Sequence, residues 1–367
     1  MSARRIFLIV LLASLLQGCA NVSYYAQAVN GQLEVYRKSR PIAEILADRG
    51  TDSELKQKLA AVLEIREYAS RELGLPDNGS YRLYADLERP YVLWNVFATP
   101  ELSLKPREWC FIVTGCVGYR GYFDEKQAQA FAAKLRAAGD DVYVGGVTAY
   151  STLRWFDDPL FNTIIHRPLP EIAGLLFHEL AHQRLYVRGD SAFSESFAMT
   201  VELEGMRRWL RDHGGPADYE AYETRLRRRE EFVALVLKHR DRLEALYESH
   251  LDPADKRAGK AQIFAELRAE YAEIKATRWN GYAGYDHWFA QDLNNAHLVS
   301  LGMYHRHVPA FQNLLARHEG DLFAFYRDAE QLGGLPPVER LAALEALTPT
   351  ATATLDGPGA PAEPQTP

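Results

Sequence analysis

The sequence contains few cysteines, no internal repeat and no excess of positive charge. Only 3 of its 367 residues are cysteine, and none of them forms the C-x-x-C spacing of common zinc modules. Lysine and arginine total 42 against 49 aspartates and glutamates, so the net charge is −7. This balance, with no basic block after the first residues, disfavours nucleic-acid binding. The remaining composition, 47% hydrophobic and 25% charged, is that of an ordinary globular protein.

The apolar run at the N-terminus is too short to span a bilayer as a mature helix. It covers the eleven residues Ile6–Leu16, follows two arginines and ends in Leu16-Gln17-Gly18-Cys19, which resembles the bacterial lipobox. We therefore predict a signal peptide over residues 1–18 and lipid attachment to Cys19, because the length disfavours a membrane anchor and the cysteine disfavours a plain secretory signal. By the same resemblance, Ala20 in place of aspartate indicates the outer membrane of a bacterial envelope, facing the periplasm.

Two cysteines remain once Cys19 is assigned to lipid. In an oxidising compartment, Cys110 and Cys116 predict a disulfide that closes a short loop. The alternative is a pair of small buried residues in a strand region, because spacing alone does not establish the geometry that a disulfide requires.

The most informative motif is His178-Glu179-Leu180-Ala181-His182, which lies in an apolar run. Residues four apart share one face of a helix, so the two imidazoles can hold one cation between them. Zinc fits best, because neutral imidazole is a borderline-soft ligand. Glu179 can accept a proton from the attacking water, so the motif predicts metal-dependent hydrolysis of a peptide bond. The alternative is a buried helix whose two histidines are satisfied by hydrogen bonds.

A catalytic zinc keeps three protein ligands and one open position. Glu195, thirteen residues after His182 at the start of the next predicted helix, is the predicted third ligand. The turn at Gly189-Asp190 lets that helix fold back, and Glu202, two turns further along it, is predicted to orient a metal-binding histidine from behind. The alternative for Glu195 is an acid placed favourably at a helix N-terminus. One Zn²⁺ per chain is expected.

The remaining sequence predicts a predominantly helical α+β protein with a small sheet before the metal helix. Three strand-like segments precede that helix: Tyr91–Phe97, Cys110–Val113 and Asp141–Val147. The metal helix is predicted over Pro170–Tyr186, and charge-dense segments with helical spacing follow it. This order is that of a zincin-like metallopeptidase. Residues 19–347 are predicted to form a single domain, and residues 348–367, rich in Thr, Ala, Pro and Gly, a disordered tail.

Several longer stretches carry a family resemblance: Trp109–Phe111, Gly115–Val117, Tyr119–Phe123, Tyr150–Leu153, Trp155–Pro159, His178–Gln183, Glu195–Ala198, Asn294–His297 and Tyr304–Arg306. They resemble a bacterial zinc aminopeptidase family whose members are predicted lipoproteins. The resemblance covers nearly the whole mature chain and implies a gluzincin-like H-E-x-x-H metallopeptidase, with zinc as cofactor and a peptide as substrate. Two positions depart from the family pattern: Ser194 stands in place of asparagine, and Arg154 in place of a small residue.

Some catalytic roles have more than one candidate. Peptide hydrolysis needs a donor for the oxyanion, and Tyr304 and His297 are candidates because they lie seven residues apart on one predicted helix. Core packing is the alternative for both. An aminopeptidase also needs an acid for the free α-amine, and its candidates are Glu202, Asp157 and Asp158. The predicted function is a zinc-dependent aminopeptidase that is lipid-anchored in the bacterial periplasm. The competing functions are a metalloendopeptidase and a non-catalytic surface lipoprotein that binds zinc, which would not need Glu179.

Overall fold

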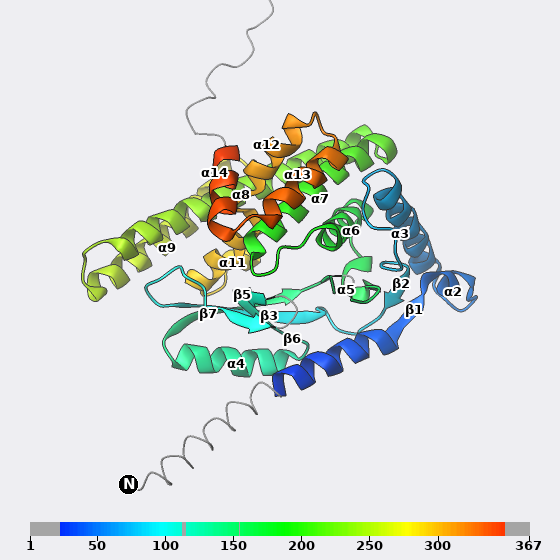
Figure 1. The fold of residues 1–367 in the computed structure, drawn as a ribbon. Coiled ribbons are helices and arrows are strands. Elements are labelled where there is room, and N and C mark those ends of the chain that lie inside the picture. The colour runs from blue at the N-terminus through cyan, green and yellow to red at the C-terminus, as the bar shows by residue number, and fades with distance from the viewer. Residues whose placement is uncertain (1–22, 112–114, 154, 349–367) are drawn as a thin grey trace, which may run out of the picture.

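A computed structural model describes residues 23–111, 115–153 and 155–348. The fold is predominantly helical with small sheets, which confirms the α+β class expected from the sequence. The central sheet lies between α4 (Glu125–Ala137), which covers one of its faces, and a larger body of helices on the other side (Figure 1).

The central sheet is antiparallel and consists of β6 (Tyr119–Tyr122), β3 (Leu93–Pro100) and β7 (Asp140–Val147), in that order. Successive side chains of a strand point to opposite faces, so β3 has two different surfaces. Val96 on one surface packs with the buried alanines of α4. Asn95 lies on the opposite surface, in register with glycines on both neighbouring strands, and faces the helical body.

Two smaller sheets complete the β structure. One joins β1 (Ser39–Pro41), β2 (Leu83–Ala85) and β8 (Leu160–Phe161), with β1 antiparallel and β8 parallel to β2. The other is the hairpin of β4 (Trp109–Phe111) and β5 (Gly115–Val117). This hairpin brings Cys110 opposite Cys116 and their sulfurs are bonded, so the expected disulfide is confirmed.

Residues 23–38 form an N-terminal helix that packs on the edge of the β structure. Its inner face contributes the buried Val35 to a small cluster with Val92 and Phe161. Its outer face leaves apolar side chains in solvent: Tyr25 at 42% exposure, Val29 at 57%, Leu33 at 49% and Tyr36 at 64%. The helix ends before β1, and Pro41 then stands at the N-cap of the next helix.

The main hydrophobic core surrounds two helices, α6 (Leu169–Arg184) and α7 (Ser191–His213). The two helices approach closely at Gly205, where an added Cβ would stand 2.8 Å from side-chain atoms of both Phe177 and Leu73. The helix α3 (Ser53–Arg71), capped by Asp52 through Leu55 N, packs against α6. A bulky side chain at position 205 would therefore separate the metal helix from its neighbour.

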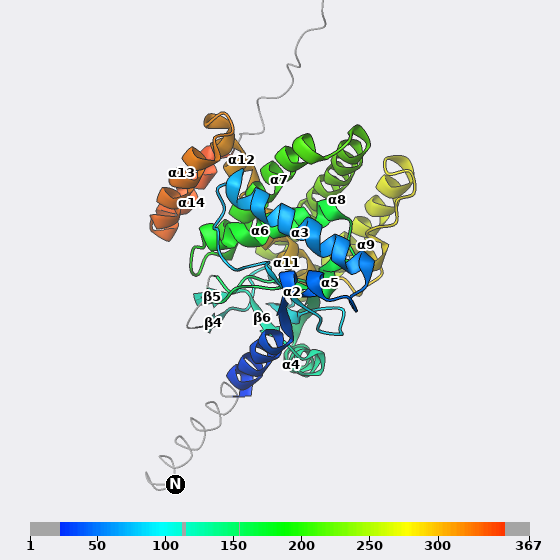
Figure 2. The ribbon, with the colours of Figure 1, turned by 90° about the vertical axis from the view of Figure 1, so that its right-hand side faces the viewer.

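The remaining helices form two groups. α8 and α9 lie alongside each other, whereas α12, α13 and α14 gather at the opposite side of the molecule (Figure 2). Their bounds are α2 (Ile42–Ala47), α5 (Asn162–Ile165), α8 (Pro216–Glu248), α9 (Pro253–Thr277), α10 (Asp286–Phe289), α11 (Asn295–His305), α12 (Val308–Arg317), α13 (Leu322–Gly334) and α14 (Pro337–Leu347). Among the described residues, no helix is both long enough and apolar enough to cross a membrane.

Candidate metal centre and active-site cleft

The metal motif lies on α6, as predicted, and its two histidines and Glu179 border a cavity. Pro168 begins this helix, and Leu185 ends it in an extended conformation. Apolar residues such as Leu176 and Leu180 are fully buried in the core. His178 and His182 are one turn apart, with ring centroids 4.9 Å from each other. Both are more than nine-tenths buried, although they border a cavity.

α7 brings Glu195 to these histidines. Gly189 adopts a left-handed φ of +80°, and Asp190 caps α7 by accepting a hydrogen bond from the Phe193 amide. This turn reverses the chain, so Glu195 lies in the first turns of a helix packed against α6. Ser194, where the family resemblance led us to expect asparagine, accepts a hydrogen bond from the Val187 amide and so ties the same turn together.

His178, His182 and Glu195 therefore form a group whose ligand atoms all lie within 4.8 Å of one another. Glu195 Oε2 is 3.3 Å from His178 Nε2 and 3.4 Å from His182 Nε2. Zinc–ligand bonds of about 2.0–2.1 Å in a tetrahedron place ligand atoms about 3.3–3.4 Å apart. Two imidazole nitrogens and one carboxylate are also a donor set typical of catalytic zinc, so these residues fit a single zinc ion with one open position.

Glu202 stands behind His178, as the helical spacing suggested. Its Oε2 lies 3.1 Å from His178 Nδ1, and its Oε1 accepts a hydrogen bond of 3.1 Å from Arg229 of α8. Burial disfavours a charged His178, but hydrogen bonds to Glu195 and Glu202 outweigh it and raise its pKa to about 10. Burial would also raise the pKa of Glu202, but Arg229 and His178 hold that pKa below its ordinary value. The contact fixes the orientation of the His178 ring.

Glu179 lines the same cavity and has the environment of a general base. It is 8% exposed. Burial raises its pKa above the ordinary value, against the opposing effect of His178 and His182. A raised pKa brings a carboxylate closer to the pH at which it can both accept and return a proton.

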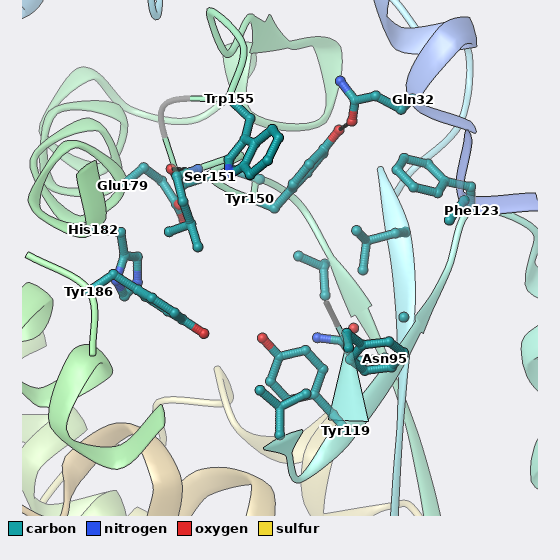
Figure 3. Close-up of a pocket in the computed structure, with 18 of the residues that line it drawn as sticks. Gln32, Asn95, Tyr119, Phe123, Tyr150, Ser151, Trp155, Glu179, His182 and Tyr186 are labelled. Atoms are coloured by element: carbon teal, nitrogen blue, oxygen red, sulfur yellow. Dashed lines mark hydrogen bonds between the residues drawn. The ribbon is translucent and has the colours of Figure 1, made fainter. Parts of the chain in front are cut away.

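The cavity beside this centre has a volume of about 710 Å³. Its floor is the metal centre, and its walls come from the strands β3 to β7, the N-terminal helix, residues 149–153 and Trp155 (Figure 3). The walls are mainly aromatic: Tyr24, Tyr25, Phe111, Phe123, Tyr150 and Trp155. Such a volume and such an apolar lining are typical of a ligand-binding cleft.

Two tyrosine hydroxyls, which the sequence analysis did not assign, point into the space between the metal centre and the sheet (Figure 3). Tyr186 follows the metal helix, with its ring centroid 6.3 Å from that of His182. Tyr119 begins β6 on the facing wall. Burial, and then the charge of Glu195, raises the pKa of both phenols, so each stays protonated and able to donate. Tyr186 lies four residues after His182, but α6 ends at Arg184, so helical spacing alone does not place its side chain beside the metal centre.

Asp158 and Asp157 lie outside the cavity lining. Both carboxylate oxygens of Asp158 accept from the Thr152 amide, and one of them also accepts from Gln183 Nε2 at 3.0 Å. Gln183 in turn donates to Ser80 Oγ. This buried network holds the 150–158 segment against α6. The Asp157 carboxylate packs on Gly79, where an added Cβ would meet it at 2.3 Å.

His297 also lies away from the metal centre. Its Nδ1 accepts a hydrogen bond from the Asn294 amide and so helps to cap α11, and its ring packs at a tilt of 33° against that of Tyr143, with centroids 4.3 Å apart. Burial, assisted by Arg268 and Arg136, lowers its pKa to about 4. The structure therefore gives His297 the core-packing role that was the alternative to oxyanion donation. The side chain of Tyr304, like Cys19 and Arg154, lies outside the described residues.

Comparison with models of known protein families supports the aminopeptidase family that the sequence resembles. A family model described as "Putative aminopeptidase" matches residues 23–344. No curated protein and no solved structure matches the chain.

Proposed function

Because the chain belongs to this aminopeptidase family, we propose that it is a zinc-dependent peptidase. The observation that carries the proposal is the buried group of His178, His182 and Glu195 at the floor of a cleft that also contains Glu179. When bound, zinc supplies a Lewis acid that polarises the scissile carbonyl and makes water more acidic. A zinc site of purely structural role would have no need of a buried carboxylate with a raised pKa on its open side.

The chain's own residues have separate tasks. Glu179 accepts the proton of the attacking water and later returns it to the leaving amine. Glu202, held by Arg229, keeps the His178 ring oriented. The protonated hydroxyls of Tyr186 and Tyr119 point into the cleft and are suitable donors to the oxyanion that forms when the carbonyl is attacked.

The predicted location is part of the proposal. We propose that Cys19 carries the lipid and that the protein is held at the bacterial envelope, facing the periplasm. The L-x-G-C pattern at residues 16–19 supports this location, and the Cys110–Cys116 disulfide is consistent with an oxidising compartment.

Two substitutions separate proton transfer from metal binding. Glu179→Gln keeps the size of the side chain and removes its basicity, so zinc content should stay near one per chain while peptide hydrolysis falls at least ~100-fold. Glu195→Ala removes a metal ligand and should lower both the zinc content and the rate of peptide hydrolysis. Glu171→Gln is a matched control, because Glu171 lies on the same helix and pairs with Arg225 outside the cleft.

Two quantities are measured for each protein: the zinc content per chain, by elemental mass spectrometry, and the rate of hydrolysis of a peptide library. If Glu179→Gln hydrolyses peptides at the parent rate, the proposed mechanism is wrong. If the zinc-loaded parent cleaves no peptide, the non-catalytic lipoprotein is the better interpretation.

A further inference from the structure

The cleft above the metal centre is almost free of charge. Among the described residues that line it, the ionisable acids and histidines are those of the centre itself: Glu179, Glu195, His178 and His182. We infer that this cleft selects peptide segments with a large apolar side chain and that a free α-amine contributes nothing to their recognition. The inference rests on the proposed peptidase function and narrows its substrate class.

The walls favour an apolar side chain. Leu93, Val117, Val147 and Leu153 stand between the aromatic rings, so a substrate side chain entering the cleft contacts carbon on several sides. Trp155 is 68% exposed at the rim, and its indole faces the cavity (Figure 3). Covering such surfaces with a phenylalanine or leucine side chain removes apolar area from water on both partners.

An ammonium group would find no spare carboxylate in this cleft. Of the three acids that could have bound it, Glu202 is engaged by His178 and Arg229, Asp158 by the 150–158 segment, and Asp157 lies against Gly79. An unpaired charge is costly to bury in an apolar site. The free amine therefore has to stay in solvent or be absent.

A neutral group supplies the polar contact that the substrate backbone needs. Asn95 projects from β3 into the cleft, is 7% exposed, and its Oδ1 is buried with no partner (Figure 3). A side-chain amide offers both a donor and an acceptor, which match the C=O and N–H of a peptide bond. An unmet buried polar atom at this place is explained when a peptide backbone lies beside it.

Binding can be measured without turnover on the zinc-loaded Glu179→Gln protein. The probes are tetrapeptide amides X-Ala-Ala-Ala, with phenylalanine, alanine or lysine as X, each prepared with a free and with an acetylated N-terminus. Isothermal titration calorimetry gives the dissociation constants, and metal analysis confirms that zinc is present in every sample.

We expect phenylalanine peptides to bind ~10- to ~100-fold more tightly than alanine peptides, and lysine peptides no better than alanine peptides. Acetylation should change the dissociation constant by less than ~3-fold. Trp155→Ala, at an exposed position that should not affect folding, should weaken the binding of the phenylalanine peptides more than that of the alanine peptides. Asn95→Asp introduces a carboxylate of equal size and should make free-amine peptides bind ~5-fold better than their acetylated partners.

Loss of binding on acetylation, a preference for lysine, or no binding by any peptide would overturn the inference. If apolar peptides bind as expected but the parent enzyme does not cleave them, the proposed function fails and the inference stands. If Asn95→Asp does not fold, as judged by its thermal transition, the acetylation series on the Glu179→Gln protein and the Trp155→Ala change still decide the outcome.

Discussion

Acidification should destabilise this protein through His297, a residue outside the metal centre. His297 is 4% exposed, its ring packs at a tilt against that of Tyr143, and its Nδ1 accepts a hydrogen bond from the Asn294 amide. Protonation would remove that acceptor and place a charge near Arg268 and Arg136. The folded protein therefore keeps the imidazole neutral, whereas the unfolded chain does not.

The magnitude follows from the two pKa values. In the unfolded chain the imidazole has its ordinary pKa of 6.5, and in the folded protein burial lowers its pKa to about 4. As the pH falls, the unfolded state binds the proton first, so the stability contributed by the neutral ring is complete above pH 6.5 and is lost between 6.5 and 4. At about 1.36 kcal/mol per pH unit the full loss is about 3 kcal/mol, of which about 2 kcal/mol is lost by pH 5.

The assay is urea unfolding of the parent and of His297→Gln at pH 7.5 and pH 5, with zinc constant. Glutamine can replace the ring as the acceptor for the Asn294 amide, because it is a normal residue at the third position of a capping box. The parent should lose about 2 kcal/mol more than the variant between the two pH values. His250→Gln, at an exposed position, should behave as the parent. Equal losses in parent and His297→Gln would refute this account.

Three other changes have defined outcomes. Gln183→Ala removes one of the donors to the buried Asp158 carboxylate, which keeps the Thr152 amide, and should lower the free energy of unfolding by about 1–3 kcal/mol, measured by urea unfolding. Gly205→Ala places a Cβ 2.8 Å from Phe177 and should cost about 1–3 kcal/mol, with a lower zinc occupancy because the metal helix is displaced; an unchanged thermal midpoint would contradict the close packing. Cys19→Ser should abolish acylation, and mass spectrometry that still finds acyl chains on the mature protein would reject the lipobox.

The part of the site that depends on local spacing could be predicted from the sequence. His178 and His182 had to share a face once the apolar run made α6 a helix, and the turn at Gly189 returned the chain so that Glu195 met them. The disulfide between Cys110 and Cys116 could also be predicted from their short separation, and the hairpin places the two residues directly opposite each other.

The cleft walls could not be predicted, because they come from segments far apart in the chain. Tyr24, Asn95, Tyr119 and Tyr150 meet only after the N-terminal helix, the sheet and the 149–155 region have packed together. The boundaries of the later helices were not predicted either. The Asn294 side chain caps α11, and α11 is thereby separated from α10.

The position of the N-terminal helix limits the distance between the cleft and the membrane. Tyr24 and Tyr25 in the cleft wall follow Cys19, the proposed lipid-bearing residue, by five and six residues. Five residues reach at most about 18 Å even when fully extended. Because the segment between the lipid and the cleft wall is so short, the cleft wall stays within roughly half a bilayer's thickness of the membrane surface. The cleft would then reach only polypeptides that come within this distance of the membrane surface, and those polypeptides would be its accessible substrates.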